Sequence, residues 1–188
     1  MNENRNDTAK WLQYLLYVGI APLVNSLLGI FGLPGLGWIL FACNAAAVYL
    51  LLQLAGSNPR YKTAAIFYAV SLAGSLIGNV FLNLAISVCS IIGQYQEYHA
   101  HGELIAARDS KLSDNWNTLF GMQIALSVIA VLLTGLVAGI LAALTNMSVD
   151  AVTPIVTVLV AVLSAGLRAL YLVYLSRTVK LLAAEASI

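Results

Sequence analysis

Five of the charged or amide side chains in the long apolar stretches of this chain, one from each stretch, could together bind a polar solute. They are Arg168, Asn25, Asn44, Asn83 and Gln123. Counting about 1.5 Å per helical residue from the ends of the stretches places them all on the order of 10 Å below one membrane surface. The guanidinium of Arg168 has five N–H donors, which need acceptors once the side chain leaves water. The pattern therefore predicts a binding site for an anionic small molecule or a lipid headgroup.

Arg168 also has a simpler interpretation, because it is the only charged residue inside the predicted apolar segments. A long side chain near a helix end can snorkel to the lipid headgroups, and Tyr171 and Tyr174 follow it. An ionisable residue within a membrane segment is still a functional-site hypothesis by default. Those segments contain no Asp or Glu, so the sequence disfavours a proton relay built on carboxylates.

A second group of chemically capable residues lies in the stretch Glu97-Tyr-His-Ala-His-Gly-Glu103. Glu97 and His101 are four residues apart, as are His99 and Glu103, so each pair would share a face of a helix. Two His and two Glu can hold a metal. The stretch lacks the H-E-x-x-H pattern, however, and Gly102 is expected to interrupt a helix there. We therefore predict a solvated loop and no metal site.

Sequence motifs of known catalytic chemistry are missing. There is no G-x-S-x-G, P-loop or C-x-x-C pattern, and no nucleophile accompanies the two histidines. We therefore predict no catalytic residues, no cofactor and no enzyme activity. The net charge of +1 comes from scattered groups, which excludes a basic patch for nucleic acid. Cys43 and Cys89 fall in apolar segments, where a thiol acts as a small hydrophobe.

The chain that must position these residues has the composition of an integral membrane protein. Of the 188 residues, 61% are hydrophobic and 9% are charged, and the mean hydropathy is +0.88. About 20 apolar residues are needed for a helix to cross the hydrocarbon layer. The prediction is one all-α, polytopic transmembrane helical bundle spanning residues 1–188, with membrane-spanning helices at 11–33, 36–55, 63–92, 117–145 and 151–175. Five crossings would place the termini on opposite sides of the membrane.

The predicted connections include one turn and one long loop. The glycines and proline of residues 31–37 are expected to end the first helix and to form a tight hairpin. If that hairpin is re-entrant, the chain has four crossings. Residues 93–116 are predicted to form an extramembrane loop with a short surface helix at Glu103–Lys111, and Ser113 or Asp114 would cap the next helix. Lys and Arg are equally divided between the two predicted sides, so their distribution gives no orientation.

Small and polar residues predict where helices pack together. Gly74 and Gly78, and likewise Gly135 and Gly139, have the spacing that lets two helix backbones approach. Ser75 and Asn79 belong to a stripe of polar residues with four-residue spacing along the third segment, namely Ser71, Ser75, Asn79, Asn83 and Ser87. That stripe fits either interhelical hydrogen bonding or a wet path. Aromatic residues at helix ends, Trp38 and Trp116 among them, are expected to lie at the membrane surfaces.

Two functional classes fit this sequence. The first, favoured by the short chain and the lack of carboxylates in the segments, is a non-catalytic membrane subunit or scaffold that binds other membrane proteins or forms a homo-oligomer. The alternative is a small oligomeric carrier or channel that binds an anionic or polar solute near Arg168. In both cases the lipid bilayer is the surrounding partner, and the bacterial plasma membrane is the expected location.

Overall fold

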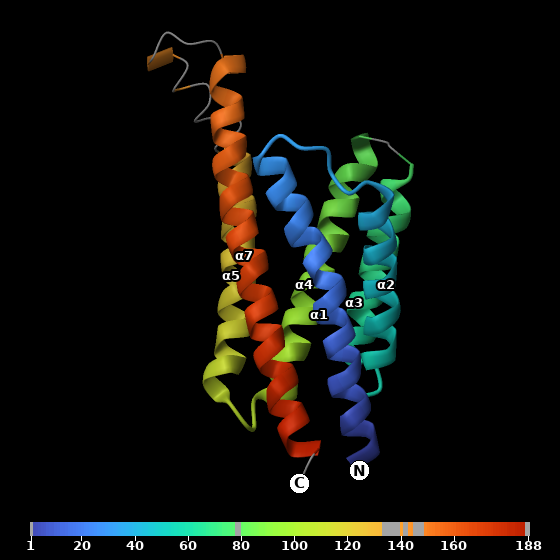
Figure 1. Cartoon of the computed structure of the whole chain (residues 1–188). Helices are drawn as coiled ribbons and strands as arrows, with labels where there is room; N and C mark the ends of the chain where they lie inside the picture. Colours follow the sequence, from blue (N-terminus) through green and yellow to red (C-terminus); the bar gives the residue numbers. More distant parts are fainter. Residues whose placement is uncertain (1, 78–79, 133–139, 141–142, 145–148, 187–188) are drawn as a thin grey trace.

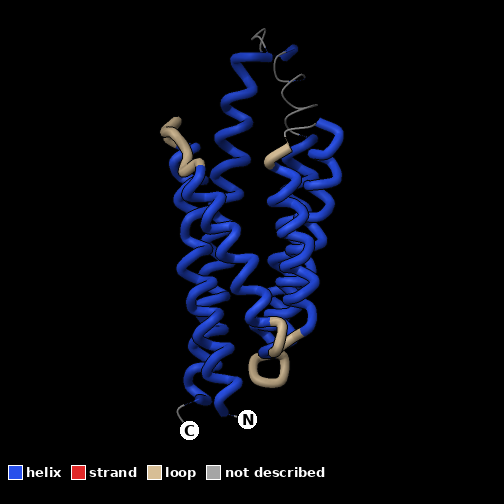
Figure 2. The backbone as a smooth tube through the Cα atoms, turned by 90° about the vertical axis from the view of Figure 1, so that its right-hand side faces the viewer, coloured by secondary structure: helices blue, strands red, loops and turns tan. Residues whose placement is uncertain are grey.

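Six helices make up most of the chain in the computed structural model, which describes residues 2–77, 80–132, 140, 143–144 and 149–186. Consecutive helices run in opposite directions (Figure 1), and the described residues contain no strand (Figure 2). The helices are α1 Asn2–Ile30, α2 Trp38–Leu54, α3 Pro59–Ser75, α4 Val80–Ile105, α5 Ser110–Leu132 and α7 Val149–Ala186. The all-helical prediction is therefore confirmed.

The six helices close into a ring. Helices α1 to α5 each pack against the next helix along the chain, and α7 packs against both α1 and α5. A smaller contact crosses the ring between α4 and α7. This arrangement leaves a central space between helices that are far apart in the sequence, and it brings side chains from all six toward one axis.

Local sequence signals explain several helix ends. The predicted turn at 31–37 is present, and Gly32 there has φ +66°, which a residue with a side chain rarely adopts. Asn58 precedes α3, where its side-chain oxygen accepts a hydrogen bond from the N–H of Arg60 at 2.9 Å. The carboxylate of Asp109 accepts from the N–H of Leu112 at 2.8 Å, so Asp109 caps α5 in place of the predicted Ser113 or Asp114.

The predicted helix at 63–92 is wrong, because two antiparallel helices occupy this stretch. Helix α3 ends at Ser75, where the N–H groups of Leu76 and Ile77 bond to carbonyls three residues back. Gly74 and Ser75 are weak helix formers at this end. A single helix over 63–92 would also measure about 45 Å, which exceeds the roughly 30 Å of hydrocarbon. The apolar run was too long for one crossing, and this excess length was the sequence signal for a turn within it.

The predicted loop at 93–116 is also wrong. Helix α4 continues to Ile105, a short turn follows, and α5 begins at Ser110. The helix passes through Gly102, where an added Cβ would meet the backbone oxygen of Ser113 at 3.3 Å. Gly102 is therefore a place of close approach between α4 and α5. The expected surface helix at Glu103–Lys111 does not form, because this stretch turns the chain between the two helices.

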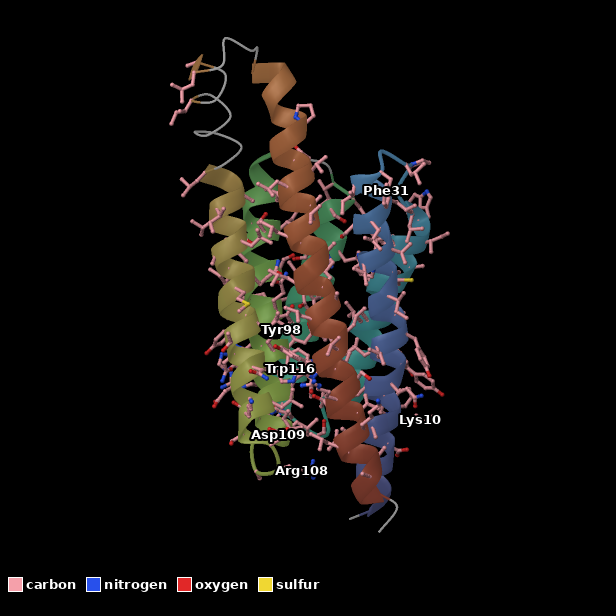
Figure 3. All side chains as sticks on the ribbon, turned by 60° about the vertical axis from the view of Figure 1, so that its left-hand side comes forward. Lys10, Phe31, Tyr98, Arg108, Asp109 and Trp116 are labelled. Carbon is pink, nitrogen blue, oxygen red and sulfur yellow. The ribbon has the colours of Figure 1, made fainter. Side chains whose placement is uncertain are left out.

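Both termini lie at the same end of the bundle (Figure 1), contrary to the predicted opposite sides, because dividing 63–92 adds one helix. This division also changes the end of the bundle to which several basic residues are assigned. Eight of the nine Lys and Arg residues now belong to the end that carries the termini. They are Arg5, Lys10, Arg60, Lys62, Arg108, Lys111, Arg177 and Lys180. Lys10 and Arg108 mark this charged end in Figure 3, and Phe31 marks the opposite end, to which no Lys or Arg belongs.

Two of the described helices are long and apolar enough to cross a membrane, over Asp7–Ile30 and Thr157–Ala184. Only 6% and 11% of their most apolar windows are buried inside the protein. The apolar helix Trp38–Leu54 is shorter. These segments therefore present apolar side chains to their surroundings, which is what a lipid-facing helix does and what the core helix of a soluble protein does not do.

Candidate functional site

A cavity of about 400 Å³ lies at the centre of the ring and is lined by residues from all six described helices. Helices α1 and α2 supply mostly apolar side chains, and the other helices supply most of the polar ones. The polar lining consists of Asn44, Tyr68, Ser71, Ser75, Ser90, Gln94, Glu97, Tyr98, Gln123, Arg168 and Tyr171. The volume falls within the usual range for small-molecule sites.

Arg168 lies near the middle of α7 and lines this cavity. Its guanidinium has no hydrogen bond or ion pair with any other residue that the structure describes. The helix continues for 18 residues beyond Arg168, to Ala186, so the side chain is about 27 Å along the axis from that end of the helix. The neighbouring Tyr171 does not lie at a membrane surface, because its hydroxyl bonds to Glu97 inside the ring.

The predicted layer of amides is only partly assembled. Asn44 and Gln123 line the same cavity as Arg168. Asn25 does not line it, because its side-chain oxygen accepts a hydrogen bond from the N–H of Leu36 at 2.9 Å and holds the 31–37 turn against α1. The side chain of Asn83 lies outside the described residues. Depth along a helix was therefore an insufficient criterion, since it does not say which way a side chain faces.

Glu97 is the principal residue that sequence reasoning missed. It was assigned to a solvated loop, but its side chain is 7% exposed and lines the cavity. Its two carboxylate oxygens accept hydrogen bonds from the hydroxyls of Tyr68 at 2.6 Å and Tyr171 at 2.5 Å. The argument against a carboxylate relay assumed an interior without Asp or Glu, and that premise is wrong.

His101 continues this polar network away from the cavity. Its Nε2 lies 3.5 Å from a carboxylate oxygen of Glu97, one helical turn earlier on α4. Its Nδ1 lies 2.8 Å from the hydroxyl of Tyr61 on α3, and both rings are fully buried. Nε2 has no hydrogen-bond partner within bonding distance among the described residues. The spacing of Glu97 and His101 was visible in the sequence, but their burial was not.

A buried aromatic cluster closes the cavity toward the charged end. Trp116 is fully buried there, and its ring lies 4.5 Å from that of His101 and 5.5 Å from that of Tyr171. Its indole N–H donates to the hydroxyl of Thr178 at 3.2 Å. Figure 3 shows Trp116 and Tyr98 within the bundle, between the middle and the charged end. Trp116 therefore packs between helices and does not face the surroundings of the bundle.

A smaller polar cluster lies at the rim of the charged end. The guanidinium of Arg60 donates to Glu103 and to Gln96, both at 2.8 Å, and the side-chain amide of Asn58 donates to Glu103 at 3.0 Å. The hydrogen bond from Asn58, together with those from Arg60, lowers the pKa of Glu103 below its ordinary value. Among the described residues, no group of three or more Cys, His, Asp or Glu side chains is placed to hold a metal.

The predicted packing residues are only partly visible. A Cβ added to Gly74 would lie 2.7 Å from the side chain of Ile86 on α4, which makes it a point of close approach between α3 and α4. Ser71 belongs to the same interface and donates to the backbone oxygen of Ile86 at 2.9 Å. Ser75 instead lines the cavity and bonds to its own helix. The remaining predicted packing residues, Gly78, Asn79, Gly135 and Gly139, lie outside the described residues.

No family model matches this chain, and no curated protein or solved structure is significantly similar to it. Any functional inference therefore depends on the cavity and the residues around it.

Proposed function

We propose that this protein crosses a membrane six times, with both termini and the charged end in the cytoplasm. The asymmetry of the basic residues supports this orientation, because eight Lys and Arg residues lie at one end and none lies at the other. The apolar outer faces of α1 and α7 support insertion into lipid. Helices α2 and α3, at 17 residues each, are at the short limit of membrane-spanning helices.

Reporter fusions distinguish six crossings from the five predicted from apolar segments alone. Fusions of a green fluorescent protein after Gly56 and after Ile188 should both fluoresce in the bacterial cytoplasm, whereas a fusion after Gly35 should not. Five crossings would place residues 56 and 188 on opposite sides. The fusion after Ile188 therefore decides between the two topologies, and the fusion after Gly56 is its internal reference.

Within this topology, we propose that the protein is a carrier that binds a small anionic solute in its central cavity. The observation that carries the proposal is the guanidinium of Arg168, which lines a space of about 400 Å³ and has no hydrogen bond or ion pair with the residues that the structure describes. Arginine stays protonated under all physiological conditions, and a cation without a partner in the middle of a membrane is costly. An anion with a planar carboxylate or with phosphate-like oxygens would supply the missing acceptors in a bidentate arrangement.

The remaining lining suits a small polar molecule. Asn44 and Gln123 supply amide donors and acceptors, and Ser75 and Ser90 supply hydroxyls. Apolar side chains of α1 and α2 line the rest, so a solute could bind through a polar group at Arg168 and an apolar part against these helices. No nucleophile is placed beside an activating base in this lining, which is why we propose transport instead of catalysis.

Ligand-dependent thermal unfolding of the detergent-purified protein tests the proposed function. The probes are acetate, benzoate and sulfate, each compared with a neutral compound of similar shape: acetamide, benzamide and dimethyl sulfone. A bound ligand raises the unfolding temperature because it binds the folded state alone. We expect at least one anion to stabilise the protein while its neutral counterpart does not. Equal shifts within every pair would contradict an anion site.

The scaffold function remains a second proposal, supported by large apolar side chains that are exposed on α2, such as Trp38 at 78% and Ile39 at 62%. Such a face suits contact with another membrane protein as well as with lipid. A scaffold should be indifferent to all three anions and should form the same assembly when Arg168 is replaced.

A further inference from the structure

We propose that the anion is carried together with a proton, and that this proton is held by the pair formed by Glu97 and His101. The inference rests on the proposed carrier function. It concerns two further groups, Glu97 in the cavity lining and His101 beside it, which the binding of an anion alone does not require.

Charge balance in the cavity is the first argument. With neutral His101, the cavity region contains one cation, Arg168, and one carboxylate, Glu97, so its net charge is zero. An anion that enters would bring the net charge of this region to minus one. Glu97 lines the same space of about 400 Å³ that the solute would occupy. The negative charges of the carboxylate and of the solute therefore repel each other. A proton taken up by the pair restores neutrality.

The side chains around Glu97 favour the pair of Glu97 and His101 as the place where the proton binds. The titratable and charged groups that contact or share its pocket come from α3, α4 and α7, while α5 contributes the indole of Trp116 against His101. These groups are Tyr61 and Tyr68 on α3, Tyr98 and His101 on α4, and Arg168 and Tyr171 on α7. The phenols are weak acids and Arg168 stays charged, which leaves the carboxylate of Glu97 and the imidazole of His101 as the proton acceptors of this pocket.

A path for the proton is present in the same network. The hydroxyl of Tyr61, the ring of His101 and the carboxylate of Glu97 form a line, with gaps of 2.8 Å and 3.5 Å between successive polar atoms. Tyr61 follows Arg60 at the charged rim, and Glu97 lines the cavity. An imidazole can accept a proton on one ring nitrogen and release one from the other. The line therefore runs through buried side chains from Tyr61, next to Arg60 in the sequence, to the lining of the cavity.

In this mechanism the proton moves from water at the charged end to the Glu97 and His101 pair while the anion binds Arg168. No covalent bond to the solute forms or breaks. Because the two sites are linked, the anion promotes proton uptake and the proton promotes anion binding to the same extent. The two buried groups share the proton, so the uptake belongs to the pair and is not assigned to a single atom.

Proton uptake on anion binding tests this inference. It is measured by titration calorimetry in two buffers of different ionisation enthalpy, with the tightest binder among acetate, benzoate and sulfate, all fully ionised near neutral pH. We expect close to one proton per anion, and binding that weakens about tenfold per pH unit where the pair titrates. Glu97→Gln should bind the anion without proton uptake or pH dependence. The matched control Glu103→Gln, which removes an exposed carboxylate, should behave as the wild type does.

The outcomes separate the two proposals. Anion binding without proton uptake would overturn the coupling and leave the carrier intact, whereas no anion binding at all would overturn both. Uptake that persists in Glu97→Gln would remove Glu97 from the mechanism. If Glu97→Gln does not fold, the infrared difference spectrum of the wild type decides the question. A protonated carboxyl band or an imidazolium band that appears on anion binding supports the inference, and the absence of both bands overturns it.

Discussion

Replacing Arg168 with glutamine should weaken binding of the anionic probe by at least about 30-fold. The guanidinium is the one cation among the described residues that line the cavity. The side chain of Arg168 is exposed in the free protein, so the cost arises once the bound anion covers it. Removing one partner of such a covered, hydrogen-bonded charge pair costs about 2–5 kcal/mol, because the other charge is left without its partner. The measurement is titration calorimetry of the detergent-purified variant with the anion that stabilises the wild type.

The same variant should be at least as stable as the wild type without ligand. The guanidinium has no protein partner among the described residues, so its removal leaves no hydrogen-bonding group unsatisfied. Arg177→Gln is the matched control, since Arg177 is also exposed on α7 but lies at the charged end. It should bind the anion as the wild type does. Equal loss of binding in both variants would indicate a general electrostatic effect and would contradict a site at Arg168.

Replacing Trp116 with alanine should produce the largest loss of stability of any single change considered for this protein. The side chain is fully buried among aromatic rings, with those of Tyr98 at 5.6 Å and Tyr174 at 5.9 Å, and it bonds to Thr178. Truncating a buried tryptophan to alanine costs about 3–5 kcal/mol. For a chain of this length that corresponds to roughly 6–20 °C in the temperature of unfolding. Thermal unfolding in detergent measures it.

Trp38→Ala is the matched control for this prediction. Trp38 is 78% exposed at the start of α2, and its replacement should change the free energy of unfolding by no more than about 0.5 kcal/mol. Both tryptophans were predicted from the sequence to lie at membrane surfaces. Similar small losses for the two variants would contradict the buried cluster around Trp116.

Some of the candidate site could be predicted from the sequence. Arg168 was found because a charge within an apolar stretch is costly and therefore rare. Asn44 and Gln123 were found with it, by depth along their helices, and both line the same cavity. Asn25 was included on the same criterion but bonds to Leu36, because depth fixes the level of a side chain and leaves its direction around the helix undetermined.

Glu97 was missed for a different reason. Polar residues such as Glu103 and His99 surround it in the sequence, and a polar stretch is usually a loop. The helix nevertheless continues, because Glu97 and His101 turn their side chains inward to partners on α3 and α7. The partner Tyr171 is 74 residues away along the chain. No local pattern could show that a charged side chain would be satisfied by so distant a residue.

The sequence by itself determined the all-helical class and several helix ends, because apolar content and capping residues such as Asn58 act within a few positions of the chain. Only the tertiary structure decided that 63–92 holds a turn, that the basic residues gather at one end, and that Glu97 and Arg168 line one cavity. These features depend on α7 closing the ring against α1 and α5. Ring closure joins residues from opposite ends of the chain, and the free energy that selects it comes from packing between helices, which no single segment contains.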